Sequence, residues 1–517
     1  MHRRSFFCYS AKTMSIHAKP AAEAADNKIK DLLEWLATNH NKKSPDDTEE
    51  LLGKLAMLRE SLIAPGQRLK LLDLLHAHAD RIVQSERPRF NNFALPLSRK
   101  SRQKVRLLLE LLDTVTLDYF NALNDSMNQA LAESKGNGAP AGSLRRLMIS
   151  IGNQIRIHHQ VASPPRSGLW EQAHLTYRIA QRTGNEEIAA PRGGQSIQRL
   201  YSNLLLLTIA HPASFSSDEL DFIDLYVAAL PDPIRFEHSE EQLAPGIFWI
   251  DPDRDFPAHA LPRRMPAGND LHIQYFSCAE AAACAGRHLK ALKKGGKALA
   301  LGLPAFADTP AGQGVLKRLV TLWGNPTKRK YPRRHQSYRA RLSSGLDASW
   351  KLLNGSGQDI DYSEWMVTNE SPEGFALMHI SGDTSELRVG DPIALQVMSE
   401  NSRDEPHWQL CIVRWAISEN PEHIEIGLQL LSARPLSAKL ALPYTVEGGH
   451  TQAILLPAIP ALGKEQALIV RSGLLKENAR RIVLMIERGN LEIREVRTST
   501  LDDQTQSIDI FSIRTET

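Results

Sequence analysis

Residues 328–342, KRKYPRRHQSYRARL, hold seven Lys or Arg residues, one His and no acidic residue. Such a density of cations predicts an anion-binding segment, and the anion could be a nucleic acid, a membrane surface or a small phosphate ligand. Over the whole chain, 62 basic residues stand against 59 acidic ones, which gives a net charge of only +3. This balance argues against a surface coated in positive charge for general nucleic-acid binding, so any basic site must be local.

A second motif follows the basic segment. Arg329 and Arg333 form an RxxxR pair, and the stretch NESPEG begins thirty-six residues after Arg333. It places Asn369, Ser371 and Gly374 in an NxSxxG pattern directly before the strand-like FALMHI. This ordered pair of motifs resembles the PilZ family, which are bacterial receptors for the second messenger cyclic di-GMP.

The resemblance covers about residues 326–435. Within this range it continues past the two motifs into LRVGD and IVRWAI, which are similar to later parts of the family's β-barrel. It implies a cyclic di-GMP site built from Arg329, Arg333, Arg334, Asn369, Ser371 and Gly374. In that site the arginines fold over the ligand from a flexible lead-in, the amide and hydroxyl face a guanine, and the glycine keeps the turn small. The chemistry fits, because a guanidinium can bind a phosphate bidentately or donate to O6 and N7 of guanine.

Each motif also has a plain structural interpretation. NESPEG consists of standard turn residues, and KRKYPRR could be a solvated interdomain linker. Two other hypotheses therefore stand beside a receptor that relays its signal to a protein partner through the helical half. One is a PilZ-like scaffold that binds protein and no nucleotide, and the other is a nucleic-acid-binding protein that uses the basic cluster at 328–341.

No other stretch predicts catalysis or metal binding. The four cysteines lack CxxC spacing, DPDRD lacks the Gly and Glu of a calcium loop, and KKGGKA lacks the glycine spacing of a P-loop, so we interpret it as a helix terminus and turn. We expect a protein that is not an enzyme and holds no cofactor, with cyclic di-GMP as its ligand. The chain has no apolar run of signal-peptide or membrane-span length, which favours a cytoplasmic location without a membrane span.

The helix and strand patterns around the motifs predict an α+β multidomain protein. At 517 residues, the chain is too long for one ordinary core. Leucines at helical spacing predict an all-helical domain over 46–232, after a loosely ordered segment at 1–45. Ser216 and Glu219 have the spacing of a capping box that opens a helix.

The C-terminal half is predicted to be mainly β structure. A mixed α/β bridging segment over 233–325 leads into the PilZ-like antiparallel barrel at 326–435, where the pattern alternates with period two. A short amphipathic helix is expected within it at 345–353. A β-rich extension covers 436–517, with RGN as a hairpin turn, and either completes the barrel or forms a second sheet.

Overall fold

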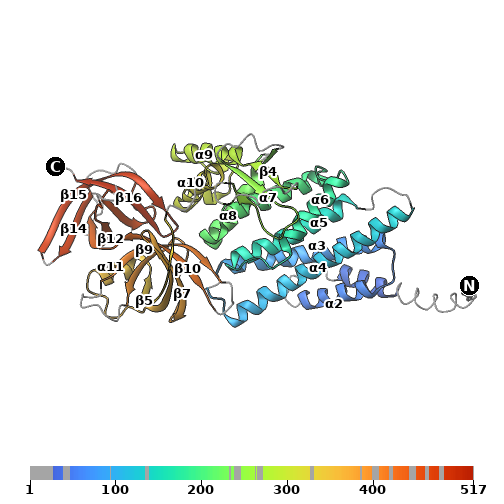
Figure 1. The fold of residues 1–517 in the computed structure, drawn as a ribbon, viewed down its shortest axis with the longest axis horizontal. Coiled ribbons are helices and arrows are strands. Elements are labelled where there is room, and N and C mark those ends of the chain that lie inside the picture. The colour runs from blue at the N-terminus through green and yellow to red at the C-terminus, as the bar shows by residue number, and fades with distance from the viewer. Residues whose placement is uncertain are drawn as a thin grey trace, which may run out of the picture. The chain divides into compact units, whose positions relative to one another are not determined.

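The computed structural model describes residues 27–38, 47–92, 95–133, 139–231, 234–237, 246–261, 264, 272–326, 331–384, 387–398, 407–418, 423–441, 450–459, 465–476, 482–488 and 490–515. The predicted α+β fold class is confirmed, because a helical N-terminal half is followed by two closed antiparallel β-barrels (Figure 1). Among the described helices, none combines the length and the apolar character that crossing a bilayer requires.

Amphipathic helices make up the N-terminal half. They are α2 (Asp47–Glu60), α3 (Pro65–Glu86), α4 (Arg99–Glu133), α5 (Ala141–Gln160), α6 (Leu169–Arg182), α7 (Ile197–Ile209) and α8 (Ser217–Ala229). Leucines at helical spacing, such as Leu51, Leu55 and Leu58 of α2, are buried. The capping box opens α8 as predicted, because the Ser216 hydroxyl accepts from the Glu219 N–H and the Glu219 carboxylate accepts from the Ser216 N–H.

A further helix runs over 27–38, inside the segment that was expected to be loosely ordered. Leu32 and Trp35 on this helix are buried. The indole N–H of Trp35 donates to Glu50 Oε1 at 2.6 Å, and the ring lies 5.0 Å from that of His78. Packing of these two apolar side chains therefore orders a helix that its polar surroundings in the sequence conceal.

The N-terminus of α6 is capped by a residue distant in sequence. Asp255 accepts hydrogen bonds from the backbone N–H groups of Gly168, Trp170 and Glu171. Partial burial alone would raise the pKa of Asp255, but these bonds outweigh it and hold the pKa below its ordinary value. The DPDRD stretch thus supplies a helix cap.

We expect Asp255→Ala to lower the free energy of unfolding by about 0.5–2 kcal/mol, the usual cost of losing an N-cap. Because the folded-state pKa is depressed, this stabilisation is present above the ordinary aspartate pKa of 3.8 and is lost as the pH falls through the lower, folded-state value. Denaturant unfolding at pH 7 and in acid measures both effects. Asp359→Ala, at an exposed position, is the control. A stability difference between parent and Asp255→Ala that does not shrink in acid would contradict the capping role.

A small sheet and two helices lie in the sequence between the N-terminal helices and the first barrel. Strands β1 (Arg235–Glu237), β2 (Ile247–Ile250), β3 (His259–Ala260) and β4 (Gln274–Ser277) pair antiparallel in the order β1-β4-β2-β3. Helices α9 (Ala279–Lys293) and α10 (Pro310–Gly324) follow and pack against each other. The KKGGKA stretch ends α9 and forms a turn, as predicted.

The first barrel contains the PilZ-like stretch. Its strands are β5 (Arg334–Ser344), β6 (Ser363–Ser371), β7 (Gly374–Ser381), β8 (Pro392–Val397), β9 (Gln409–Ile417) and β10 (Glu425–Ser432). They close in the order β10-β7-β6-β5-β8-β9 around an apolar core. Strand β5 pairs with both β6 and β8, so the inserted helix after it leaves the first strand in place.

Residues 436–515 contribute a second closed barrel, which settles the alternative that the sequence leaves open. Its strands are β11 (Leu436–Ala441), β12 (Thr451–Leu456), β13 (Ala467–Arg471), β14 (Ile482–Arg488), β15 (Asn490–Gln504) and β16 (Ile508–Thr515). They close in the order β11-β12-β13-β16-β15-β14. The predicted RGN hairpin joins β14 to β15, with Arg488 opposite Asn490.

The predicted inserted helix is present as α11 (Leu346–Leu353) and packs between the two barrels. Leu346 and Trp350 are buried in an apolar cluster with Leu410 and Ile412 of the first barrel and with residues of the second, such as Ile454. The indole N–H of Trp350 donates to the carbonyl oxygen of Ala438 on β11 at 2.7 Å. Helix α11 therefore joins the two barrels through one shared core.

Candidate ligand-binding site

One row of residues runs across five successive strands of the first barrel. Strand register aligns, in this order, His335 of β5, Asn369 of β6, Ala376 of β7, Gly427 of β10 and Trp415 of β9. Residues directly opposite one another on paired strands share a face of the sheet. The positions adjacent to this row along β7 and β10, Phe375 and Leu428, belong to the barrel core. The row therefore lies on the outer face of the barrel, and we call it the outer row.

Trp415 forms a flat aromatic surface at one end of the outer row. Its indole lies against Gly427, where a Cβ atom would overlap the indole nitrogen. Glycine at this position lets the ring lie along the sheet instead of projecting from it. Trp415 is half-buried, so part of the ring remains accessible to a ligand.

Arg333, from the RxxxR pair, lies over this indole. Its guanidinium carbon is 5.9 Å from the ring centroid, within the range of a cation–π interaction. Arg333 is exposed and immediately precedes β5. The structure thus places one arginine of the first motif on the outside of the barrel, where Asn369 of the second motif also lies on another strand.

The NxSxxG motif forms the tight turn between β6 and β7. Ser371 pairs with Gly374 in the register, and the Ser371 hydroxyl donates to the Gly374 carbonyl at 3.3 Å. A Cβ on Gly374 would overlap the carbonyl oxygen of Leu428, so only glycine fits. Since Ser371 follows Asn369 by two residues along β6, both side chains face outward.

The remaining predicted residues differ in placement. Arg334 is opposite Glu370 in the register, one position from the outer row, and so its side chain is on the other face at the barrel end. There, the Tyr338 hydroxyl donates to Glu370 at 3.0 Å. Burial raises the pKa of Tyr338, and the neighbouring Glu370 carboxylate raises it further. His335, which the motif analysis passed over, occupies the outer row in place of Arg334. Arg329 lies outside the described residues.

The chain also resembles known proteins. Residues 30–241 match the family model described as "Cyclic-di-GMP receptor FimW, N-terminal domain". This family model relates the helical half to FimW. The protein named "Cyclic-di-GMP receptor FimW" from Pseudomonas aeruginosa (strain ATCC 15692) is 21% identical over 520 residues, covering 85% of this chain and 83% of that protein. The FimW domain match begins within the helix over 27–38 and ends after α8, so it covers the helical half and not the outer row.

The sequence motifs did not identify two further residues on the outer face of the barrel, Trp415 and Arg414 of β9. Trp415 faces outward because a β-bulge occurs at Arg414, where Trp415 pairs with Gly427 and Val413 pairs with the next residue, Leu428. Arg414 is directed to Gln429, with its Nε 2.6 Å from Gln429 Oε1, and also pairs with Asp503 of the second barrel. Strict alternation through IVRWAI would place Trp415 inside, so only the bulge reveals it.

Proposed function

We propose that this protein is a cyclic di-GMP receptor that binds the dinucleotide on the outer face of the first barrel. The site is formed by Arg329 and Arg333 of the lead-in together with Asn369 and Ser371. The observation that carries the proposal is the guanidinium of Arg333 over Trp415 on the outside of the barrel, where the Asn369 side chain also lies. The similarity to FimW, a protein named as a cyclic di-GMP receptor, supports the same ligand.

The chemistry of the outer row suits a guanine dinucleotide. A flat indole accepts a purine by stacking, which contributes about 1–3 kcal/mol per base. The Asn369 amide offers a donor and an acceptor to a base edge, and the Arg333 guanidinium binds phosphate or the O6 and N7 acceptors of guanine. Because Arg333 precedes β5, ligand binding orders the lead-in over the barrel, which is a recognised type of switch.

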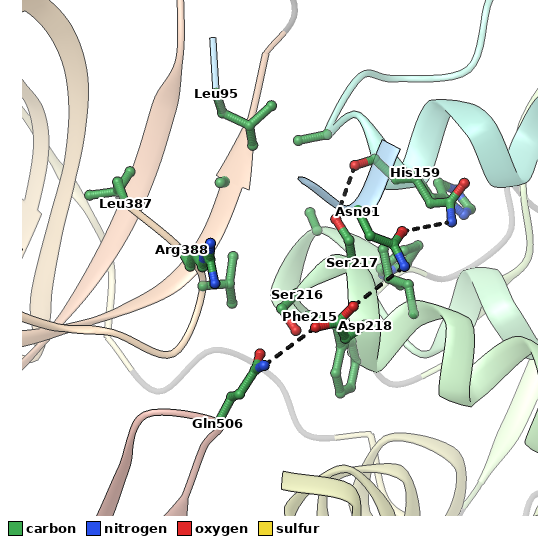
Figure 2. Close-up of a pocket in the computed structure, with 17 residues that line it drawn as sticks. Asn91, Leu95, His159, Phe215, Ser216, Ser217, Asp218, Leu387, Arg388 and Gln506 are labelled. Carbon is green, nitrogen blue, oxygen red and sulfur yellow. Dashed lines mark hydrogen bonds between the residues drawn. The ribbon is translucent and has the colours of Figure 1, made fainter. Parts of the chain in front are cut away.

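The signal then passes along β9 to the helices. One residue after Trp415, Ala416 lines a cavity of about 70 Å³ that residues of α5 and α8 also line. Figure 2 shows Leu387 and Arg388 of the barrel on one side of this cavity, and Ser217 and Asp218 of α8 on the other. At the end of β9, the Ser418 N–H donates to the carbonyl oxygen of Ala162 in the α5–α6 loop at 2.6 Å. A displacement of Trp415 would thereby reach α8 and the end of α5. The helices in turn bind a protein partner in this proposal.

Calorimetric titration of the full chain tests the proposal. We expect saturable binding of cyclic di-GMP and no binding of GTP or cyclic di-AMP at the same concentrations. Equal binding of all three, or of single-stranded DNA with a steep salt dependence, would favour the nucleic-acid alternative instead. No nucleotide binding at all would favour the protein-binding scaffold.

Asn369→Ala and Ser371→Ala are each expected to weaken cyclic di-GMP binding by up to about tenfold, since one neutral hydrogen bond contributes about 0.5–1.5 kcal/mol. The fold should remain, because both side chains are only half-buried. Ser381→Ala, at the exposed far end of β7, is the matched control. Parent-like affinity in both variants, measured by calorimetry, would return NESPEG to a plain turn.

A further inference from the structure

The end of α9 and the loop after it carry a dense group of exposed cations. They are Arg287, Lys290, Lys293, Lys294 and Lys297, and we call them the lysine patch. The sequence contains no acidic residue between Glu280 and Asp308. The patch is therefore a local positive surface, separate from the outer row, on a chain whose net charge is only +3.

The fold of α9 does not require this charge. The opposite side of the helix packs through apolar residues such as Ala281, Ala285 and Leu292, which are buried. Cations in the last turn favour the helix dipole, which accounts for one or two lysines at the C-terminus. Among the described residues, no ion pair is found for Lys290, Lys294 or Lys297. Their charges are thus uncompensated and available to an anionic partner.

A projecting apolar side chain adjoins the patch. Leu299 is 89% exposed and begins a short helical turn directly after Lys297 and Ala298. The turn is held in place because Asp308 Oδ1 accepts from the Ala298 N–H at 2.9 Å and the Leu303 N–H donates to the Ala298 carbonyl at 2.9 Å. Leu299 is therefore directed to solvent by an ordered segment, beside the uncompensated charges.

We propose that the lysine patch and Leu299 form a docking surface for an anionic lipid membrane. Lysines near a negatively charged leaflet attract it without requiring fixed geometry, and an adjacent leucine inserts at the headgroup boundary. The prevalence of lysine over arginine fits a diffuse charged surface better than a ligand that needs a bidentate fork. The combination with Leu299 favours a membrane over nucleic acid, which offers no apolar layer to insert into.

Co-sedimentation of the full chain with vesicles tests this surface independently of nucleotide binding. We expect binding to phosphatidylcholine vesicles that contain phosphatidylglycerol, and little binding to pure phosphatidylcholine. Lys290→Gln with Lys294→Gln should weaken binding about 25-fold, at about fivefold per lysine, and more at low salt than at high salt. Leu299→Ser should weaken binding at both salt concentrations.

The control is Lys70→Gln with Lys104→Gln, which removes two exposed lysines from α3 and α4 and should leave vesicle binding unchanged. Equal affinity for neutral and anionic vesicles would overturn the proposal. So would parent-like binding in both the lysine and Leu299 variants. Binding of short duplex DNA that matches vesicle binding and does not respond to Leu299→Ser would identify a general polyanion surface instead.

Discussion

Replacement of Arg333 by Lys is expected to lower the affinity for cyclic di-GMP by about ten- to a hundredfold. The substitution keeps the positive charge but removes the planar fork that binds phosphate or guanine with two parallel hydrogen bonds. A charge-assisted hydrogen bond contributes about 1.5–3 kcal/mol, which corresponds to this loss. Calorimetric titration measures it, and weak binding to bulk polyanions should survive.

The matched control for Arg333→Lys is Arg339→Lys. Arg339 is also exposed, but it lies within β5, 3.8 Å from Glu364 in an ion pair, and is not part of the RxxxR motif. This variant should bind cyclic di-GMP as the parent does. If Arg333→Lys also matches the parent, specific recognition at the lead-in is wrong and a solvated basic linker becomes the better account.

Trp350→Ala should destabilise the protein by about 3–5 kcal/mol, as truncation of a buried aromatic side chain usually does. Trp350 is 8% exposed, and its loss also leaves the Ala438 carbonyl without the indole donor. Urea unfolding monitored by circular dichroism measures the change. Folded Trp350→Ala should bind cyclic di-GMP normally, because α11 follows the end of β5 opposite to His335 and packs against β8, β11 and β12.

Trp415→Ala provides the opposite comparison. Trp415 is half-buried on the outer face, so its removal should cost less stability than removal of Trp350 but should weaken nucleotide binding. Unaltered stability with abolished nucleotide binding in Trp350→Ala would show that the roles of the two tryptophans are reversed.

Local patterns in the sequence predicted much of the fold. The capping box at Ser216, the helix at Leu346–Leu353 and the hairpin at Arg488–Asn490 each depend on residues close in sequence, and all three are present. Alternation predicted β structure after residue 326 but did not reveal that strands after Leu436 close on themselves. Closure depends on which edges meet, and a period-two pattern is the same in an open sheet and in a barrel.

The candidate site was predictable only in part, for the same physical reason. Asn369, Ser371 and Gly374 are close together in sequence, at the end of β6 and the turn into β7, so a motif can identify them. Trp415 reaches the outer face through a bulge on a strand more than forty residues later, and its position depends on Gly427 of the neighbouring strand. A residue whose orientation is decided by its cross-strand partner carries no signal in its own segment.

The core that α11 shares with both barrels determines how this part of the chain loses its structure. Leu410 and Ile412 of one barrel and Ile454 and Ile469 of the other are buried against the same helix, so melting either barrel exposes apolar surface on its neighbour. The two barrels therefore behave as one cooperative unit in thermal unfolding. A fragment that ends at residue 435, although it retains every motif residue, would carry an uncovered apolar face and a tendency to aggregate.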